Sequence, residues 1–195
     1  LTEKRVRKLR GHEIVLVPQS VSYLDPLMKV GEQVAGGKER ASLEKGRKAL
    51  GRYGLDKEVD QMYPFELSGG MARRVLIGTA VVEQPQLVIA DEPTPGLHLE
   101  AAVRVLSHFR EIADQGAGVL LITHDLELAL KTADRIVVFY AGTAVEEAAT
   151  VDFNQEAALR HPYTRALFRA MPEHGFAPEP GIQPYVRDLP EGCPY

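Results

Sequence analysis

The chain has 195 residues, of which 45% are hydrophobic and 26% are charged, and this composition is typical of an ordinary globular protein. The formal net charge of -4 gives no overall basic field, so we expect no nucleic acid partner. The single cysteine, Cys193, excludes an internal disulfide framework, and no apolar run approaches the roughly 20 residues that a membrane-spanning helix needs.

A basic run, EKRVRKLR, occupies residues 3–10. Such a run can bind phosphate or a membrane surface, but it is more often a solvated face, and we interpret it as one. The chain opens without a methionine, and the first strand pattern begins only after Glu13. We therefore expect the 195 residues to be a piece of a longer protein.

Four short runs along the chain are apolar throughout instead of alternating between apolar and polar residues. This pattern predicts buried strands of a parallel sheet that is covered on both faces. The four runs are Ile14–Val17, Leu87–Ala90, Val119–Ile122 and Ile136–Tyr140.

Helical patterns separate these runs, and the alternation predicts an α/β fold with right-handed crossovers. The predicted helices are Ala41–Tyr53, Met71–Glu83, Leu99–Gln115 and Leu126–Thr132. Residues 21–66 hold helical stretches and no convincing strand, so we expect a helical subdomain set into the sheet domain. After Val145 the patterns weaken until a helix resumes in HPYTRALFRAM. The proline-rich tail from Pro172 is expected to be extended or loop-like, with little core of its own.

Polar side chains follow three of the four predicted strands. Gln19 follows the first strand, Asp91 and Glu92 follow the second, and His124 follows the third. Because ligands of an open parallel sheet bind outside the carboxyl ends of its strands, we expect these side chains to converge on one edge. Each has a simpler explanation by itself: Gln19 as a turn residue, Asp91 as a helix cap and His124 as a loop histidine. Together they favour a functional site.

The chemistry that this set suits is phosphoryl transfer to water. Asp91 can hold Mg²⁺, which prefers oxygen ligands, and Glu92 can orient or deprotonate an attacking water. A histidine such as His124 can hydrogen-bond a terminal phosphate, and Gln19 can position water near the metal. The triplet 68–70, Ser-Gly-Gly, stands at the start of a predicted helix. It either ends a flexible loop or offers main-chain N–H donors to an anion.

Four motifs, in this order and spacing, resemble the nucleotide-binding subunit of ATP-binding-cassette (ABC) transporters. VPQS (17–20) resembles the Q-loop, and LSGGM (67–71) resembles the signature motif. LVIADEPT (87–94) resembles the Walker B strand with its catalytic glutamate, and LLITHD (120–125) resembles the switch histidine segment. The resemblance implies an α/β fold: a partial P-loop NTPase (RecA-like) ABC nucleotide-binding domain, with a parallel sheet and an inserted helical subdomain.

The same resemblance implies four segments along the chain. Residues 1–20 would end the first part of the catalytic core with the Q-loop, and residues 21–83 would form the helical subdomain with the signature motif. Residues 84–150 would form the RecA-like core with Walker B, the D-loop and the switch histidine. Residues 151–195 would form a C-terminal extension of the importer type.

Four further stretches are similar to the dipeptide, oligopeptide and nickel importers within this family. They are KLRGHEIVLVPQSVSYLDPLMKVGEQV (8–34), YPFELSGGMARRVLIGTA (63–80), HPYTRALFRAMP (161–172) and LPEGCPY (189–195). Fuller members carry more cysteines in the last stretch. Here only Cys193 is present, so no multi-cysteine metal cluster can form within this chain.

The family's residue roles carry over by position. The signature residues would touch the γ-phosphate of ATP held mainly by a partner subunit; these residues are Leu67, Ser68, Gly69 and Gly70. The resemblance implies Asp91 as a Mg²⁺ ligand, Glu92 as the general base and His124 as a stabiliser of the γ-phosphate. Gln19 would take part in catalysis and Mg²⁺ binding and would link the site to the membrane subunits.

Two features depart from the family pattern. No G-x-x-x-x-G-K-[ST] occurs in the sequence, so the phosphate-binding P-loop is missing and the chain is expected to start after it. We therefore expect the chain by itself to bind ATP poorly and to hydrolyse almost none. The second departure is His98, which stands where the D-loop usually has an aspartate. It is either a sign of asymmetry between paired sites or a harmless change at a surface turn.

The resemblance implies an ATPase subunit that powers the import of peptides or nickel and binds ATP and Mg²⁺. Its partners would be a second ABC ATPase subunit, identical or paralogous, the transmembrane permease subunits and, indirectly, a solute-binding protein. Its place would be peripheral, on the cytoplasmic face of the membrane. Two alternatives stay open: a non-catalytic cassette that acts as an interaction module, and an ABC ATPase of DNA repair or chromosome organisation.

Overall fold

The computed structural model describes residues 2–177, 184, 185, 187 and 189–195 of the chain. The chain folds as two compact units, which meet between His124 and Asp125, inside the segment 84–150 that the sequence grouped as one core. Each unit is described by itself below. Residues 178–183, 186 and 188 of the predicted extended tail lie outside the described residues.

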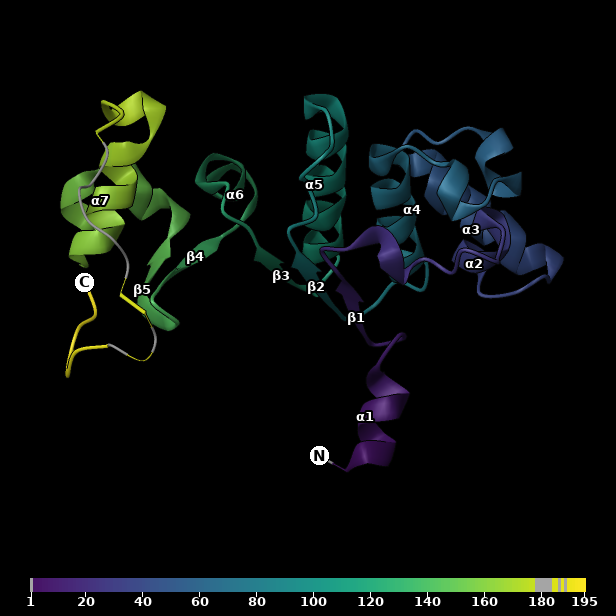
Figure 1. The fold of residues 1–195 in the computed structure, drawn as a ribbon, viewed down its shortest axis with the longest axis horizontal. Coiled ribbons are helices and arrows are strands. Elements are labelled where there is room, and N and C mark those ends of the chain that lie inside the picture. The colour runs from purple at the N-terminus through teal and green to yellow at the C-terminus, as the bar shows by residue number, and fades with distance from the viewer. Residues whose placement is uncertain (1, 178–183, 186, 188) are drawn as a thin grey trace. The chain divides into compact units, whose positions relative to one another are not determined.

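A three-stranded parallel sheet forms the centre of the first unit (Figure 1). Its strands are β1 (Ile14–Val17), β2 (Leu87–Asp91) and β3 (Gly118–Ile122), in the spatial order β1-β2-β3. The register pairs Val17 with Ala90 and Asp91 with Ile122, so the three carboxyl ends lie at one edge. The first three predicted strands and their parallel pairing are confirmed.

The two faces of this sheet differ in their exposure. Val17, Val88 and Ala90 are completely buried on one face. The other face is apolar as well, yet Leu16 is 55% exposed, Leu120 is 52% exposed and Ile122 is 48% exposed. The expectation of a sheet covered on both faces is therefore wrong for the described residues, since their helices cover only one face.

The segment between β1 and β2 is helical, as the sequence predicted. It contains α2 (Val30–Ala35), α3 (Arg40–Arg52) and α4 (Gly69–Val81), with short 3₁₀ turns between them. A hydrophobic cluster of its own holds these helices together; its members include Val30, Val34, Leu50, Val75 and Leu76. The segment is therefore a helical insert with its own core, attached to the sheet through α4.

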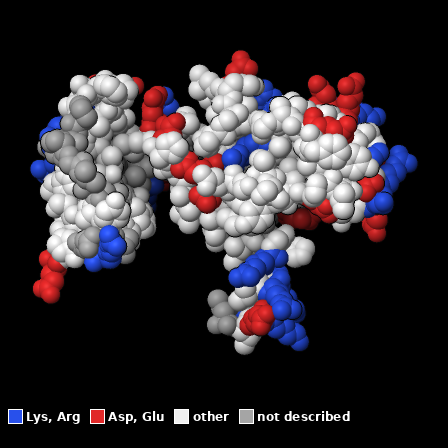
Figure 2. Space-filling view, in the orientation of Figure 1, with Lys and Arg blue, Asp and Glu red and all other residues white. Residues whose placement is uncertain are grey.

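Two more helices belong to the first unit. Helix α5 (Leu99–Asp114) joins β2 to β3 and buries one face that includes Val105, Leu106 and Phe109. Helix α1 (Glu3–Leu9) carries the basic run and buries no residue. Figure 2 shows Lys and Arg gathered on it, as expected for a solvated face.

The second unit contains α6 (Leu126–Thr132), a two-stranded sheet and α7 (Pro162–Ala170). Strand β4 (Arg135–Tyr140) pairs antiparallel with β5 (Thr143–Ala149). The sequence predicted β4 as a buried parallel strand and overlooked β5, so that prediction is wrong. The physical reason is a two-residue hairpin turn, in which Ala141 and Gly142 both have positive φ angles, of 48° and 78°.

A buried carboxylate connects β5 to the start of α7. Glu146 is 3% exposed at its side chain, and it accepts hydrogen bonds from the main-chain N–H groups of Arg160 and His161, each at 2.8 Å. Burial raises the pKa of this carboxyl, but the two N–H donors outweigh it and the pKa lies below its usual value. The segment HPYTRAL is therefore fixed to the hairpin by an ionised side chain.

Candidate active site at the carboxyl edge of the sheet

Four predicted site residues lie at the carboxyl edge of the three-stranded sheet. Gln19 follows β1 by two residues, Asp91 ends β2, Glu92 comes next, and His124 follows β3 by two residues. The predicted convergence on one edge is confirmed by the strand order and register. Gln19 is exposed, and its side chain has no hydrogen-bond partner in the part of the chain that the structure describes.

Glu92 and His124 form the tightest polar contact of this edge. One carboxylate oxygen of Glu92, Oε1, accepts a hydrogen bond from the main-chain N–H of His124 at 3.1 Å and lies 2.7 Å from its Nδ1. The Glu92 side chain is 16% exposed, whereas that of His124 is 80% exposed. The imidazole therefore stands at the surface above a carboxylate that is largely withdrawn from water.

The second carboxylate oxygen of Glu92 has a different environment. Oε2 is buried and has no hydrogen-bond partner among the described residues. The backbone of Glu92 is in the left-handed region, with φ of 46°, while its N–H donates to the carbonyl of Ile122 at 2.9 Å. Backbone strain and an unsatisfied buried oxygen are both features that recur at functional sites.

The start of α4 carries the signature-like segment. Ser68 is the N-cap residue, and its Oγ accepts a hydrogen bond from the N–H of Met71 at 3.3 Å. The N–H groups of Gly69 and Gly70 donate to no acceptor that the structure describes, as is usual at a helix start. Leu67, which the sequence grouped with these residues, packs its side chain against the hydrophobic cluster of the insert.

The two glycines of this segment differ in their surroundings. A Cβ placed on Gly70 would lie 3.3 Å from the carbonyl oxygen of Gly96, a tight contact, so the close approach of two backbone segments favours glycine at that position. A Cβ on Gly69 would meet nothing within 4 Å. No contact within the described chain therefore requires glycine at position 69.

His98, the unusual D-loop residue, has a structural role. Its Nδ1 accepts a hydrogen bond from the N–H of Ala101 at 3.3 Å and so caps the start of α5. An aspartate at this position could accept the same bond, since aspartate is a favoured N-cap residue.

Arg73 belongs to this region as well, and none of the sequence motifs predicted its part in it. Arg73 lies on α4, is only 9% exposed, and donates from Nη1 to the carbonyl of Pro18 at 3.3 Å. An arginine inside a helix usually lies at the surface, so only its position between buried apolar neighbours in GGMARRVLIG could have drawn attention to it.

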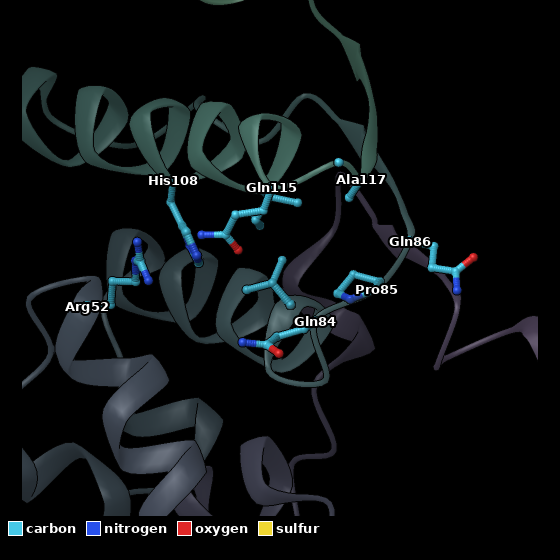
Figure 3. A pocket seen from close by; sticks show the side chains of 10 residues that line it. Arg52, Gln84, Pro85, Gln86, His108, Gln115 and Ala117 are labelled. Carbon is cyan, nitrogen blue, oxygen red and sulfur yellow. The ribbon is translucent and has the colours of Figure 1, made fainter.

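A cavity of about 370 Å³ lies elsewhere on the first unit, beside the starts of β2 and β3 (Figure 3). Its lining includes Arg52, Gln84, His108 and Gln115, and the side chains of His108 and Gln115 reach toward it from α5 and its end. Burial, with a smaller effect of the Arg52 charge, lowers the pKa of His108 to about 4, and Nδ1 of His108 is hydrogen-bonded to the hydroxyl of Tyr53. This cavity is separate from the carboxyl edge, because it adjoins the opposite ends of the strands.

Two family models match the chain. A model described as "ABC transporter" matches residues 1–95, and a model described as "Oligopeptide/dipeptide transporter, C-terminal region" matches residues 145–195. Only residues 96–144 are left unmatched by these two models.

The chain is also similar to individual proteins. It is 34% identical over 217 residues to a Brucella melitensis ATP-binding protein named for peptide import, with 100% of this chain and 64% of that protein covered. It is 35% identical over 210 residues to the dipeptide transport ATP-binding protein DppD of Escherichia coli, with 99% of this chain and 63% of DppD covered. The chain thus spans less than two thirds of the length of these curated relatives.

Solved structures share the fold. The dimeric ABC transporter cassette MJ0796 superimposes with a TM-score of 0.71 at 24% identity, over 77% of this chain and 68% of that one. The ATP-binding subunit of another ABC transporter gives a TM-score of 0.66 at 27% identity, over 76% and 63% of the two chains. The fold, the two family models and the relatives agree, and the chain belongs to the ATP-binding proteins of the ABC transporter family.

Proposed function

We propose that this chain is the ATP-binding and ATP-hydrolysing subunit of an ABC importer that takes up peptides through a membrane permease. The observation that carries the proposal is the pairing of Glu92 with His124 at the carboxyl edge of the sheet. It joins a withdrawn carboxylate to an exposed imidazole at the place where ligands of parallel sheets bind.

The two carboxylate oxygens of Glu92 would have different functions in general base catalysis. Oε1 is engaged by the N–H and the Nδ1 of His124, which fixes the orientation of the carboxylate. Oε2 is the oxygen that can accept a hydrogen bond, and then a proton, from an attacking water. The exposed ring of His124 lies next to the Glu92 carboxylate, where it can contact the terminal phosphate of ATP.

The start of α4 would act on ATP held by a second subunit. Gly69 is exposed, with open space where a Cβ would stand, and the N–H groups of Gly69 and Gly70 have no acceptor among the described residues. The positive end of the helix dipole favours a phosphate there. Solved relatives of the fold include a dimeric cassette, which supports a partner that completes each site.

Asp91 and Gln19 are the residues that would hold Mg²⁺. Both offer oxygen atoms at the edge where Glu92 Oε2 is left without a partner, which fits a hard cation and its water shell. Among the described residues no group of three or more His, Cys, Asp or Glu side chains could hold a metal ion, so phosphate and water would supply the other ligands. When bound, Mg²⁺ supplies charge neutralisation at the phosphates.

The permease would dock on the helical insert. Tyr23 and Leu27, which follow the Q-loop segment, are 72% and 87% exposed, and Phe65 before the signature segment is 74% exposed. Apolar side chains mark an interaction surface where they form a contiguous patch, and we propose that these three contribute to one such surface. No described helix is long and apolar enough to cross a bilayer. We propose a peripheral position on the cytoplasmic face of the membrane.

Peptides are the proposed cargo rather than nickel. The C-terminal residues match the oligopeptide/dipeptide transporter model, and the relatives described above are named for peptide or dipeptide transport. We propose that the imported substrate never touches this subunit and that its identity is set by the permease and a solute-binding protein.

The test uses the natural polypeptide that carries these residues, reconstituted in proteoliposomes with its partner cassette, its permease and a binding protein. We expect Mg²⁺-dependent ATP hydrolysis coupled to dipeptide uptake, and a loss of at least about 100-fold in kcat for Glu92→Gln, the size of a lost general base. If the assembled wild-type complex binds the permease but hydrolyses no ATP, the enzymatic proposal is wrong and an interaction module remains. Nickel uptake without dipeptide uptake would overturn the proposed cargo.

A further inference from the structure

Arg73 occupies an unusual position on α4. Its neighbours on the buried side of the helix are Ala72, Val75, Leu76 and Ile77, and Arg73 as a whole residue is only 9% exposed. A buried guanidinium is costly unless it is paired and hydrogen-bonded. Its environment therefore has to supply compensating groups.

One compensating group is the main chain just before the Q-loop glutamine. Nη1 of Arg73 donates to the carbonyl oxygen of Pro18 at 3.3 Å, and Pro18 lies between the end of β1 and Gln19. The hydrogen bond joins the helix that begins with the signature segment to the segment that carries Gln19.

The other compensating group is Glu92. Burial lowers the pKa of Arg73, and the negative charge of Glu92 acts in the opposite direction. The carboxylate is mostly withdrawn from water, its Oε2 has no hydrogen-bond partner among the described residues, and a second carboxylate, Asp91, precedes it in the chain. A nearby guanidinium offsets the repulsion of two adjacent carboxylates at this edge.

We propose that Arg73 is a positioning residue, which holds the main chain before Gln19 against the signature helix and compensates the charge of Glu92. The inference rests on the proposed ATPase function and extends it to a residue that the motifs do not include. Because the hydrogen bond ties Pro18 to Arg73, a displacement of the Q-loop segment would break or move this contact with the signature helix.

Arg74 provides a matched control on the same helix. It is half-buried, and its side chain donates to the carbonyl oxygens of Gly70, Tyr53 and Gly54, all within the helical insert. Substitution of Arg74 should therefore disturb the insert without altering the surroundings of Glu92.

The kinetic test compares Arg73→Gln and Arg73→Lys in the reconstituted complex described above. We expect Arg73→Gln to lower kcat by about tenfold or more, the range for a lost hydrogen bond to a charged group, with the KM for ATP changed by less than about twofold. Arg73→Lys should restore most of the kcat because it keeps the charge. Arg74→Gln should show no coupling with Glu92→Gln in the stability measurement below, because its acceptors all lie in the insert.

The outcomes separate the two proposals. A wild-type complex without Mg²⁺-dependent hydrolysis contradicts the proposed function itself. An active wild type with an unchanged kcat for Arg73→Gln, or an equal loss for Arg73→Lys and Arg73→Gln, overturns only the role of Arg73.

A second measurement does not depend on activity. The urea midpoints of the chain are compared for Arg73→Gln, Glu92→Gln and the double variant. If the two charges compensate each other, the double variant should lose less than the sum of the two single shifts, because neither charge is then left unpaired. Additive shifts would overturn the inference.

Discussion

Gly70 and Gly96 lie so close that a Cβ on Gly70 would stand 3.3 Å from the carbonyl oxygen of Gly96 and 3.7 Å from a side-chain carbon of Leu97. The contact brings the start of α4 against the loop that follows β2. Gly69, the preceding residue, has no such neighbour within 4 Å. Steric contact within the chain therefore favours glycine at position 70 but not at position 69.

Alanine substitutions at these two positions should differ in their effect on stability. Gly70→Ala should lower the free energy of unfolding by about 1 kcal/mol or more, because the backbone of the 94–97 loop must shift. Gly69→Ala should leave stability unchanged or slightly higher, since alanine is the better helix former. Urea unfolding measures both. If a phosphate of the partner site approaches the Gly69 backbone closely, the added Cβ would obstruct it, and Gly69→Ala should weaken ATP-dependent association of the paired cassettes. Equal stability effects at both positions would contradict the assignment.

Two substitutions of Ser68 can separate its capping role from its proposed role at a phosphate. Ser68→Ala removes the acceptor for the Met71 N–H and should cost about 1 kcal/mol of stability. Ser68→Asp keeps a capping oxygen and should retain stability, but its charge would repel a phosphate. We expect Ser68→Asp to fold normally and to abolish ATP-driven transport. Normal transport by Ser68→Asp would remove the phosphate role.

His98 should behave as a replaceable N-cap. His98→Asp keeps an acceptor for the Ala101 N–H and should match or exceed the wild-type stability, whereas His98→Ala should lose about 1 kcal/mol. Thermal unfolding followed by far-UV circular dichroism provides the measurement. Indistinguishable melting of His98→Ala and the wild type would show that the cap contributes nothing.

The half-buried His108 predicts a pH dependence of stability. Its pKa is about 4 in the folded chain against an ordinary value of 6.5, so between these values the unfolded chain binds more protons and the folded state loses stability as the pH falls. Above pH 6.5 the neutral His108 makes its full contribution to the free energy of unfolding. We expect His108→Gln to flatten the change in urea midpoint between pH 7 and pH 5, while a matched change at the exposed His12 should leave that slope as in the wild type.

Glu146 should be important for the second unit. Glu146→Gln weakens the hydrogen bonds from the N–H groups of Arg160 and His161 and should cost about 2 kcal/mol, since bonds to a charged acceptor are the strong ones. Because the pKa of Glu146 is lowered on folding, the contribution should disappear as the pH falls below 4.5. Hydrogen exchange at the two amides measures the effect directly. The exposed neighbour Glu147, paired with Arg135 at 2.7 Å, is the control and should matter little.

Local patterns were sufficient to predict most of the elements. The apolar runs located β1 to β3 within one residue at each end, and helix periodicity located α5 at Leu99–Asp114 against an expected end at Gln115. Both patterns depend only on neighbours in the sequence. The pairing of β4 with β5 was missed because it depends on two positive φ angles in an Ala-Gly turn. Alanine is not among the residues that predict such a turn.

The location of the site could be predicted because the strand assignments determine which residues lie at the carboxyl edge of the sheet. The sequence alone placed Asp91, Glu92 and His124 together, and the contact between the last two bears out that placement, while their chemical roles stay predictions. The sequence could not predict that one carboxylate oxygen of Glu92 is hydrogen-bonded while the other has no partner among the described residues. It also could not predict the burial of Arg73. Both depend on side-chain packing between segments that are distant in the sequence.

The open face of the central sheet has a thermodynamic consequence. Leu16, Leu120 and Ile122 present apolar side chains to solvent, and hydration of such surface raises the heat capacity of a protein in water. Whatever segment or subunit covers these side chains will release that hydration water. Its association should therefore be accompanied by a negative change in heat capacity, and the enthalpy of binding should become steadily more favourable as the temperature is raised.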